Sequence, residues 1–438
     1  MSHLNIQEKY GLVIILLSIV TRIFVVSIAW NYGIFITAIK QTAPGTLFSE
    51  LGWIAGLAQG LGSLISPMYI VISKKLGFKL TFFVGIFLCF LSLLASSFVP
   101  SEHFLFLTYS LPYGIGSSII FVLGSLLTGM YYPPNHKYHV TATVSISLGF
   151  PIGFLIINPL NESLLKYYDN DWQLVQRIYS VIVLILMGIT SLFFTDKYSN
   201  KIEHQMEIRD EIAYKDEFLS IKSKHLSFIV RFLWLFGLVC NSIANTSILT
   251  NLNGYLTSSG VDSAELKLDF VILGLADGLF RIFLAIIGPR IKKNLSSMYI
   301  LASFFGFILS NLWADHIVPL FNTIYCLVFG MCPAVLMSLM YSVNTEITGT
   351  NQIEKNYTIN VMMSGVGIII GPLLSGLLLD TSDKNYDKVF KMAYRFYFMC
   401  IISYSLMKFL LLKYSIRVCK QSREDVRLNS YSPFKNES

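Results

Sequence analysis

The chain has 438 residues, of which 54% are hydrophobic and 13% are charged. Its mean hydropathy is +0.60, whereas an ordinary soluble protein is about 25% charged. A water-exposed globule could not bury so much apolar surface, so the composition excludes a soluble protein and indicates an integral membrane protein. The net charge of +7 is explained by membrane orientation and by attraction to anionic lipid head groups, and no aromatic-interleaved basic patch indicates nucleic acid.

Apolar stretches long enough to cross a bilayer recur along the chain, each with about 20 apolar residues. In chain order they cover residues 12–39, 51–73, 79–99, 104–130, 138–160, 176–195, 226–256, 268–288, 296–313, 317–343, 357–379 and 389–412. We therefore predict an all-α membrane protein with twelve transmembrane helices in two six-helix bundles. Kinks or local breaks are expected where prolines fall inside spans, namely at Pro67, Pro112, Pro151, Pro333 and Pro372.

A polar stretch after the sixth span divides the chain into two halves. We expect an N-terminal bundle at 1–195, a linker at 196–225, a C-terminal bundle at 226–412 and a tail at 413–438. The linker carries both charge signs near helical spacing, which fits a solvated connector or a partner site. Lys and Arg concentrate in alternate loops, such as "SKKLGFK" and "GPRIKKN", so the positive-inside rule predicts that both termini and the linker are cytoplasmic.

The N-terminal stretch "MSHLNIQEKYG" has little of the basic region of a cleaved signal, and the span after it exceeds a signal-peptide core. We expect a retained first helix. The six cysteines show no spacing typical of a disulfide framework or a metal site. No cofactor, metal or enzymatic function is expected, since no metal, triad or phosphate-loop motif occurs.

Small residues recur on two of the predicted spans. Gly52, Gly56 and Gly60 lie every four residues in "GWIAGLAQGLG", and Gly367 and Gly371 share that spacing in "SGVGIIIGPLLSG". In a helix this spacing leaves one flat face, which lets another backbone approach closely. We predict close helix packing at both places.

Two full charges stand in the apolar stretch "GLADGLFRIFLAIIG". Asp277 and Arg281 are four residues apart, so a helix places them on nearly the same face, one turn apart. A charge at the bilayer centre costs about 2.5–3.5 kcal/mol on insertion scales and usually faces the bundle interior. Either the two form a permanent internal salt bridge, or Arg281 is the anion-binding group of a central cavity, because its planar fork matches a carboxylate.

The second reading predicts a coupled mechanism. An incoming carboxylate competes with Asp277 for Arg281 and leaves Asp277 without its partner. The poorly solvated carboxylate then favours its protonated form. This exchange would couple one proton to one anion without a histidine.

Several stretches resemble the monocarboxylate transporter family, a branch of the major facilitator superfamily, over about residues 28–400. The quoted segments are "LFSELGWIAG", "SKKLGFKLTFFVG", "PYGIGSSIIF", "SLGFPIGF", "GLADGLFR" and "GPLLSGLLLD". The resemblance implies two rocking halves around a midplane substrate site. The lysine of lactate-type members is replaced by Tyr32, so the resemblance implies the carrier fold rather than lactate as the substrate.

The same resemblance suggests further site residues. Arg22 replaces the missing lysine as a gating cation, or it snorkels to the interface. Lys137 and His139 are candidates for the basic positions of the fifth-helix signature. In this fold the first and seventh helices line the cavity, so the resemblance implies hydrogen bonds to the substrate from Asn31, Tyr32, Asn241 and Asn245. The asparagines are explained nearly as well by polar packing between helices.

The function expected is secondary transport of a small organic anion, with protons as the candidate coupling ion. A first alternative is an uncoupled facilitator of amino acids or other zwitterions, as the resemblance implies for relatives without the lysine. A second is a non-transporting receptor or scaffold, which the costly pair Asp277–Arg281 disfavours. We favour the plasma membrane over an organelle, and the family resemblance implies a single-span ancillary subunit that the sequence does not identify.

Overall fold

The computed structural model describes residues 6–134, 136–193, 224–292, 294–313, 319–348, 353–382 and 385–430. Most of the expected linker, the loop around residue 315 and the last part of the tail lie outside the described residues. Within the described ranges all regular structure is helical and no strand occurs. The prediction of an all-α protein is therefore confirmed.

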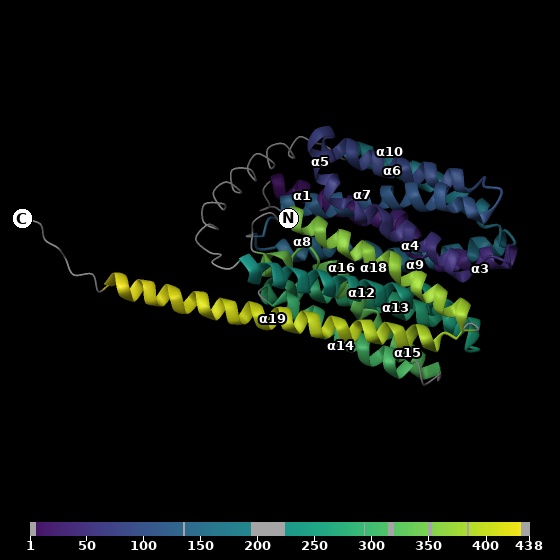
Figure 1. The fold of residues 1–438 in the computed structure, drawn as a ribbon. Coiled ribbons are helices and arrows are strands. Elements are labelled where there is room, and N and C mark those ends of the chain that lie inside the picture. Colours follow the sequence, from purple (N-terminus) through teal and green to yellow (C-terminus); the bar gives the residue numbers. More distant parts are fainter. Residues whose placement is uncertain are drawn as a thin grey trace, which may run out of the picture.

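Eleven helices in the described ranges are long and apolar enough to cross a membrane, or up to 12 if a bent helix pair counts as one span. The bent pair is α4 (Phe48–Leu64) and α5 (Ser66–Leu76), which meet at 56°. It corresponds to the second predicted span. The helices run roughly parallel to one long axis (Figure 1), as spans of one bilayer must.

The first half of the chain contains α1 (Ile6–Thr21), η1 (Arg22–Val26), α2 (Ser27–Trp30), α3 (Gly33–Thr42), α4, α5, α6 (Phe78–Ser96), η2 (Glu102–Phe104), η3 (Phe106–Ser110), α7 (Leu111–Tyr131), α8 (His139–Ser145), η4 (Ile146–Leu148), α9 (Gly149–Tyr167) and α10 (Trp172–Phe193). The second half contains α12 (Lys224–Ser258), α13 (Ser263–Ile291), α14 (Leu295–Trp313), α15 (Pro319–Phe329), α16 (Met331–Leu339), α17 (Asn344–Ile347), α18 (Ile353–Thr381) and α19 (Asp387–Ser430). Helix α19 continues past the predicted end of its span and projects beyond the bundle (Figure 1).

Helix interruptions coincide with most of the prolines singled out in the sequence. Pro67 is the second residue of α5, just after the bend, and Pro112 is the second residue of α7, just after the π-helical turn η3. Pro151 follows the 3-10 turn η4, and Pro333 stands in the first turn of α16. A proline lacks the N–H donor that a continuous helix needs, so breaks form there. Pro372 differs, because α18 continues through it.

The glycine stripe of α4 faces α18, so one helix from each half meets at this contact. A Cβ added at Gly52 would lie 2.7 Å from the carbonyl oxygen of Pro372, and one at Gly60 would lie 2.8 Å from that of Gly365. On α18, a Cβ at Gly367 would lie 2.4 Å from the carbonyl oxygen of Val239 in α12. Both predicted packing faces are confirmed, since only glycine permits such backbone approach.

Buried apolar side chains form three clusters. The largest lies mostly in α1–α10, and the other two lie mostly in α12–α19. Each half therefore has its own apolar core. The polar residues described next lie near the contact between the halves, where α8, η4 and α9 meet α13 and α16.

Candidate functional site

Asp277 and Arg281 form a two-pronged ion pair on one face of α13. Nε of Arg281 donates to Oδ1 of Asp277 at 2.8 Å, and Nη2 donates to Oδ2 at 3.0 Å. The side chains are almost fully buried, since Arg281 is 1% exposed and Asp277 is 7% exposed. This is the planar fork-to-carboxylate geometry expected from their four-residue spacing.

The third guanidinium nitrogen of Arg281 points toward the contact between the halves. Nη1 donates to Oγ of Ser338 in α16 at 3.3 Å, and that hydroxyl lies 2.7 Å from Oγ of Ser147 in η4. One turn away, the hydroxyls of Thr143 and Ser342 lie 2.8 Å apart. Short hydroxyl bonds thus connect the charged pair to the opposite half of the molecule.

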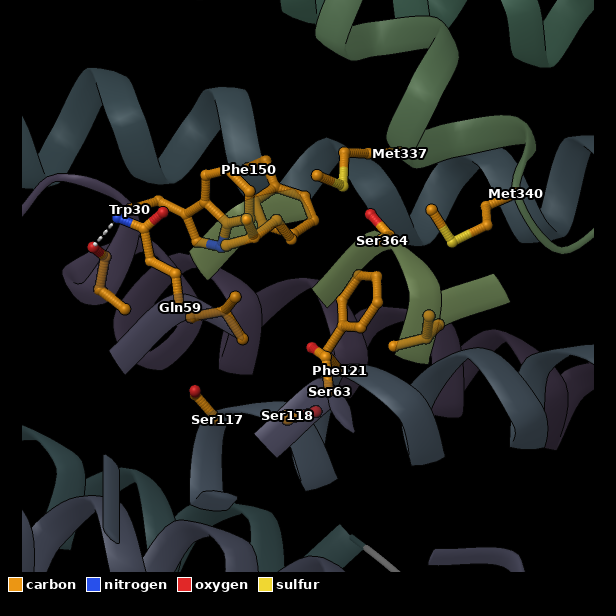
Figure 2. Close-up of a pocket in the computed structure, with 14 residues that line it drawn as sticks. Trp30, Gln59, Ser63, Ser117, Ser118, Phe121, Phe150, Met337, Met340 and Ser364 are labelled. Carbon is orange, nitrogen blue, oxygen red and sulfur yellow. Dashed lines mark hydrogen bonds between the residues drawn. The ribbon is translucent and has the colours of Figure 1, made fainter. Parts of the chain in front are cut away.

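A cavity lies beside this pair, between α2, α4, α7, α9, α16 and α18 (Figure 2). Its empty volume is ≈ 460 Å³, which includes the open space at its mouth. Both halves of the chain contribute to its wall. The polar lining residues are Gln59, Ser63, Ser117, Ser118 and Ser364.

Aromatic side chains form much of the remaining wall. The ring of Phe150 packs edge-on against Trp30 and against Phe121, with centroids 5.9 Å apart in both cases. Behind this wall, the guanidinium carbon Cζ of Arg281 lies 5.5 Å from the centroid of the Phe150 ring. Phe150 therefore touches both the cavity and the guanidinium, and Arg281 is not itself among the lining residues.

Arg22 is buried within the bundle, at the start of the π-helical turn η1, and is 1% exposed. Its Nη2 donates to the carbonyl oxygen of Phe121 at 2.9 Å and to Oγ of Ser125 at 2.7 Å. Its Cζ lies 4.7 Å from the Phe121 ring centroid and 5.9 Å from that of Phe150. The two buried arginines thus share Phe150 as a neighbour.

The other first-helix candidates lie away from the cavity lining. Asn31 and Tyr32 occupy the break between α2 and α3, where Nδ2 of Asn31 donates to the carbonyl oxygen of Ser27 at 2.7 Å. The ring of Tyr32 stacks between Phe35, at 5.4 Å, and Tyr109, at 4.6 Å. Both residues pack within the first half.

The α12 candidates also lie outside the cavity lining. Asn245 donates through Nδ2 to Oδ1 of Asn241 at 2.5 Å, and Asn241 donates to Oγ of Ser303 in α14 at 3.5 Å. Asn241 therefore contacts α14, and Asn245 contacts Asn241 within α12. Among the basic candidates of the fifth-helix signature, Lys137 is exposed beside the Tyr138 ring.

His139 is buried where α8 begins, and its Nδ1 lies 2.6 Å from the carbonyl oxygen of Tyr132. Its ring centroid lies 5.8 Å from that of Tyr341, a residue of the second half. The histidine thus lies at the contact between the halves, away from the cavity lining.

Sequence reasoning missed the residues that line the cavity. Trp30 directly precedes Asn31, and Gln59 donates through Nε2 to the carbonyl oxygen of Ala29 at 3.0 Å. Gln59 and Ser63 stand four residues apart on α4 beside the glycine stripe. Two polar residues at helical spacing in an apolar span could have indicated a cavity wall. A serine at such a position, however, is equally typical of interhelical packing.

The sequence profile of the Major Facilitator Superfamily matches residues 19–372 and 235–427. Monocarboxylate transporter 9 of Pongo abelii is 29% identical over 123 residues, a match that covers 28% of this chain and only 23% of that protein's length. Monocarboxylate transporter 6 of Mus musculus is 23% identical over 407 residues, covering 88% of this chain and 84% of the relative.

A solved structure shares the fold. The proton:xylose symporter XylE bound to 6-bromo-6-deoxy-D-glucose superimposes with a TM-score of 0.66, covering 92% of this chain and 96% of that one, at 14% identity. This likeness confirms the predicted two-bundle fold of twelve transmembrane helices. Members of this superfamily are multi-pass membrane transporters of small molecules rather than enzymes. The chain therefore belongs to the major facilitator superfamily, as a divergent member similar to the monocarboxylate transporters.

Proposed function

We propose that this protein is a secondary transporter that moves a small organic anion by alternating access. In this proposal Arg281 is the carboxylate anchor and Asp277 is the proton and charge switch. The observation that carries it is the buried two-pronged pair on α13, at 2.8 and 3.0 Å, next to a cavity lined by both halves. In the pair, the Asp277 carboxylate occupies the position on the Arg281 guanidinium that a substrate carboxylate would take.

The exchange of partners supplies the coupling. Removing one partner from a buried ion pair costs about 3–5 kcal/mol, because the remaining charge is left unpaired. A substrate carboxylate that displaces Asp277 keeps Arg281 paired but leaves Asp277 alone at low exposure. Protonation of Asp277 removes that cost. Anion and proton therefore bind together more favourably than either alone.

Alternating access needs contacts between the halves that can break. At one end, the carboxylate of Asp380 in α18 accepts hydrogen bonds from the backbone N–H groups of Phe48 and Ser49, at 3.3 and 3.0 Å. At the other end, Thr143 pairs with Ser342, and the Lys292 ammonium donates to the carbonyl oxygen of Pro134. The contacts at each end include a few polar bonds that water can replace.

The remaining parts of the proposal concern organisation and placement. We assign the two bundles to residues 1–195 and 226–412, joined by the linker at 196–225 and followed by a tail at 413–438. The positive-inside rule, applied to the turn that carries Lys74 and Lys75, orients both termini toward the cytoplasm. The plasma membrane is the proposed location, with an ancillary single-span subunit as a candidate partner.

Transport of a zwitterion is the first alternative. In the exchange described above, the ammonium of an amino acid would take the place of the proton at the displaced Asp277 carboxylate, so this alternative differs from the proposal in lacking proton coupling. A non-transporting receptor or scaffold is the second alternative. Such a protein would have no use for a buried charged pair at the contact between its halves.

Uptake into proteoliposomes tests the proposal. The full chain is assayed with short and aryl monocarboxylates and with tyrosine and tryptophan, each at acidic and neutral external pH. We expect saturable anion uptake that acidity stimulates and that Arg281→Gln abolishes. Uptake of the zwitterions alone would favour the first alternative, and the absence of flux for every solute would favour a receptor or scaffold.

A further inference from the structure

A tyrosine of the second half is seated in a notch on a helix of the first half. Tyr341 lies in the turn between α16 and α17, and its ring faces Gly129 in α7. A Cβ added at Gly129 would lie 2.2 Å from the phenol oxygen Oη of Tyr341 and 2.3 Å from its Cζ. Carbon atoms in contact normally lie about 3.5–4.0 Å apart. Position 129 therefore has room for the tyrosine ring only because glycine has no side chain.

The ring of Tyr341 belongs to a larger aromatic contact between the halves. It packs against the ring of Tyr357 in α18, with centroids 5.0 Å apart, and against the ring of His139 in α8, with centroids 5.8 Å apart. Tyr341 is 4% exposed and Tyr357 is 2% exposed. The largest apolar cluster lies mostly in the first half, yet it also includes second-half residues, namely Met340, Tyr341, Ile353, Tyr357 and Val361. At this end, side chains of the second half complete the apolar core of the first.

The aromatic contact lies at one end of the cavity. Met340 lines the cavity and directly precedes Tyr341. On α7, Phe121 lines the cavity, and Gly129 follows two turns later, about 12 Å further along the helix. Helix α6 leaves the basic turn that the positive-inside rule assigns to the cytoplasm, and α7 returns to that side. The contact of Tyr341 with Gly129 therefore lies between the cavity and the cytoplasm.

Opening at this end requires the ring to leave its notch. Gly129 and Tyr341 lie in opposite halves, so separation of the halves here pulls the ring away from α7. The hydroxyl pair Thr143–Ser342 in the same region can exchange its hydrogen bond for bonds to water. A buried aromatic ring has no such substitute, because its stabilisation comes from the apolar area that it covers. The ring is therefore the part of this contact that water cannot replace.

We infer that Tyr341, seated at Gly129 and backed by Tyr357, is the side chain that closes the cavity at its cytoplasmic end. The inference rests on the proposed function and adds the group that controls access to the site from one side. With the ring in its notch the cavity is closed to the cytoplasm, and with the ring withdrawn it is open. A methyl group at position 129 therefore acts like removal of the ring, because it expels the ring from its seat.

The test measures how fast a cysteine in the cavity reacts from the cytoplasmic side. The reporter is Gln59→Cys in the full chain, with Cys419→Ser to remove the tail cysteine, and an impermeant maleimide is added to inside-out membrane vesicles. The chain without the reporter gives the background from the buried native cysteines. We expect Gly129→Ala and Tyr341→Ala each to raise the labelling rate by about tenfold, because both shift the population toward the open form. Tyr341→Phe, which keeps the ring, should stay within about twofold of the parent.

Gly11→Ala is the matched control, since its added Cβ would lie 2.9 Å from Cε2 of Tyr132, a tyrosine of the same half. This substitution crowds a tyrosine ring away from the contact between the halves and should leave the labelling rate unchanged. A double substitution gives a sharper check. In the Tyr341→Ala background, Gly129→Ala should add little, because the ring that the methyl group would expel is already gone. If Gly129→Ala does not fold, the comparison of Tyr341→Ala with Tyr341→Phe still tests the role of the ring.

The inference is overturned if folded Gly129→Ala and Tyr341→Ala variants label at the rate of the parent, or if Gly11→Ala raises the rate as much as Gly129→Ala. A full further effect of Gly129→Ala in the Tyr341→Ala background would also reject it, since the methyl group would then act elsewhere. Its failure is distinguishable from that of the proposed function, because labelling requires no substrate. Faster labelling in both variants without flux of any anion would support Tyr341 as the closing side chain and reject anion transport. Anion flux with a labelling rate that does not depend on Tyr341 would do the reverse.

Discussion

At the scale of single residues, the proposal depends on the shape of one guanidinium. Arg281 uses all three of its nitrogens, two on Asp277 and one on Ser338. A lysine ammonium is a compact charge and cannot offer two parallel donors to one carboxylate. The two parallel donors of the guanidinium therefore contribute to carboxylate binding in addition to its positive charge.

The substitution Arg281→Lys should keep the charge and weaken recognition of the anion. We expect KM for anion uptake to rise by roughly tenfold, about 1.4 kcal/mol, because one of two charge-assisted hydrogen bonds is lost. Initial uptake rates against substrate concentration measure this. Arg290→Lys, at an exposed position of the same helix, is the control and should leave KM for anion uptake unchanged. Unchanged KM in Arg281→Lys would count against the anchor role.

The candidate residues also show what sequence could and could not reveal at this scale. The pairing of Asp277 with Arg281 follows from helical spacing alone, and the structure contains this ion pair. The positions of Asn241 and Tyr32 depend on which neighbour each helix face meets, and here the neighbours are Ser303 and Tyr109. Spacing along one helix carries no information about the rotation of that helix against its partners.

At the scale of helices, the contact between α4 and α18 depends on glycines, which have no side chain to hold the two backbones apart. Gly52 and Gly60 bring backbone against backbone along this contact. The hydropathy pattern and the glycine spacing predicted both the spans and the close packing. The 56° bend between α4 and α5 was predicted only as a kink at Pro67. Its angle depends on the tertiary contacts of both segments, which no local pattern encodes.

Gly52→Ala should destabilise the protein. Its Cβ would lie 2.7 Å from the carbonyl oxygen of Pro372, and a backbone atom cannot move aside without shifting α18. We expect a loss of about 1–3 kcal/mol, as for other overpacked sites, seen as a lower melting temperature in detergent. Gly45→Ala is the control, since no atom lies within 4 Å of its added Cβ. Equal melting temperatures for the two variants would contradict the close contact.

At the scale of the whole molecule, the two halves are joined at opposite ends by different polar contacts. The carboxylate of Asp380 binds the first N–H groups of α4, where the helix dipole favours a negative charge. The far end is joined by hydroxyl pairs such as Thr143–Ser342. Opening at either end requires only the contacts at that end to break, which is what alternating access demands.

Asp380→Asn should favour opening at the end where α4 begins. The charge-assisted bonds to Phe48 and Ser49 would become neutral ones and weaken. A cysteine placed in the cavity by Gln59→Cys should then react several-fold faster with an impermeant maleimide added from that side. Glu102→Gln is the control, because its partner Thr46 lies in the same half. An unaltered labelling rate in Asp380→Asn would show that this contact does not hold the end closed.

The most direct test of the central claim is simultaneous measurement of proton and anion influx into proteoliposomes. Asp277→Asn leaves the carboxylate anchor in place but removes the group that takes up the proton. Anion uptake should therefore persist while proton influx and acid stimulation disappear. Asp269→Asn, a buried acid on the same helix that is bonded to Thr323, should retain both. Proton influx in the Asp277→Asn variant equal to that of the wild type would contradict the account.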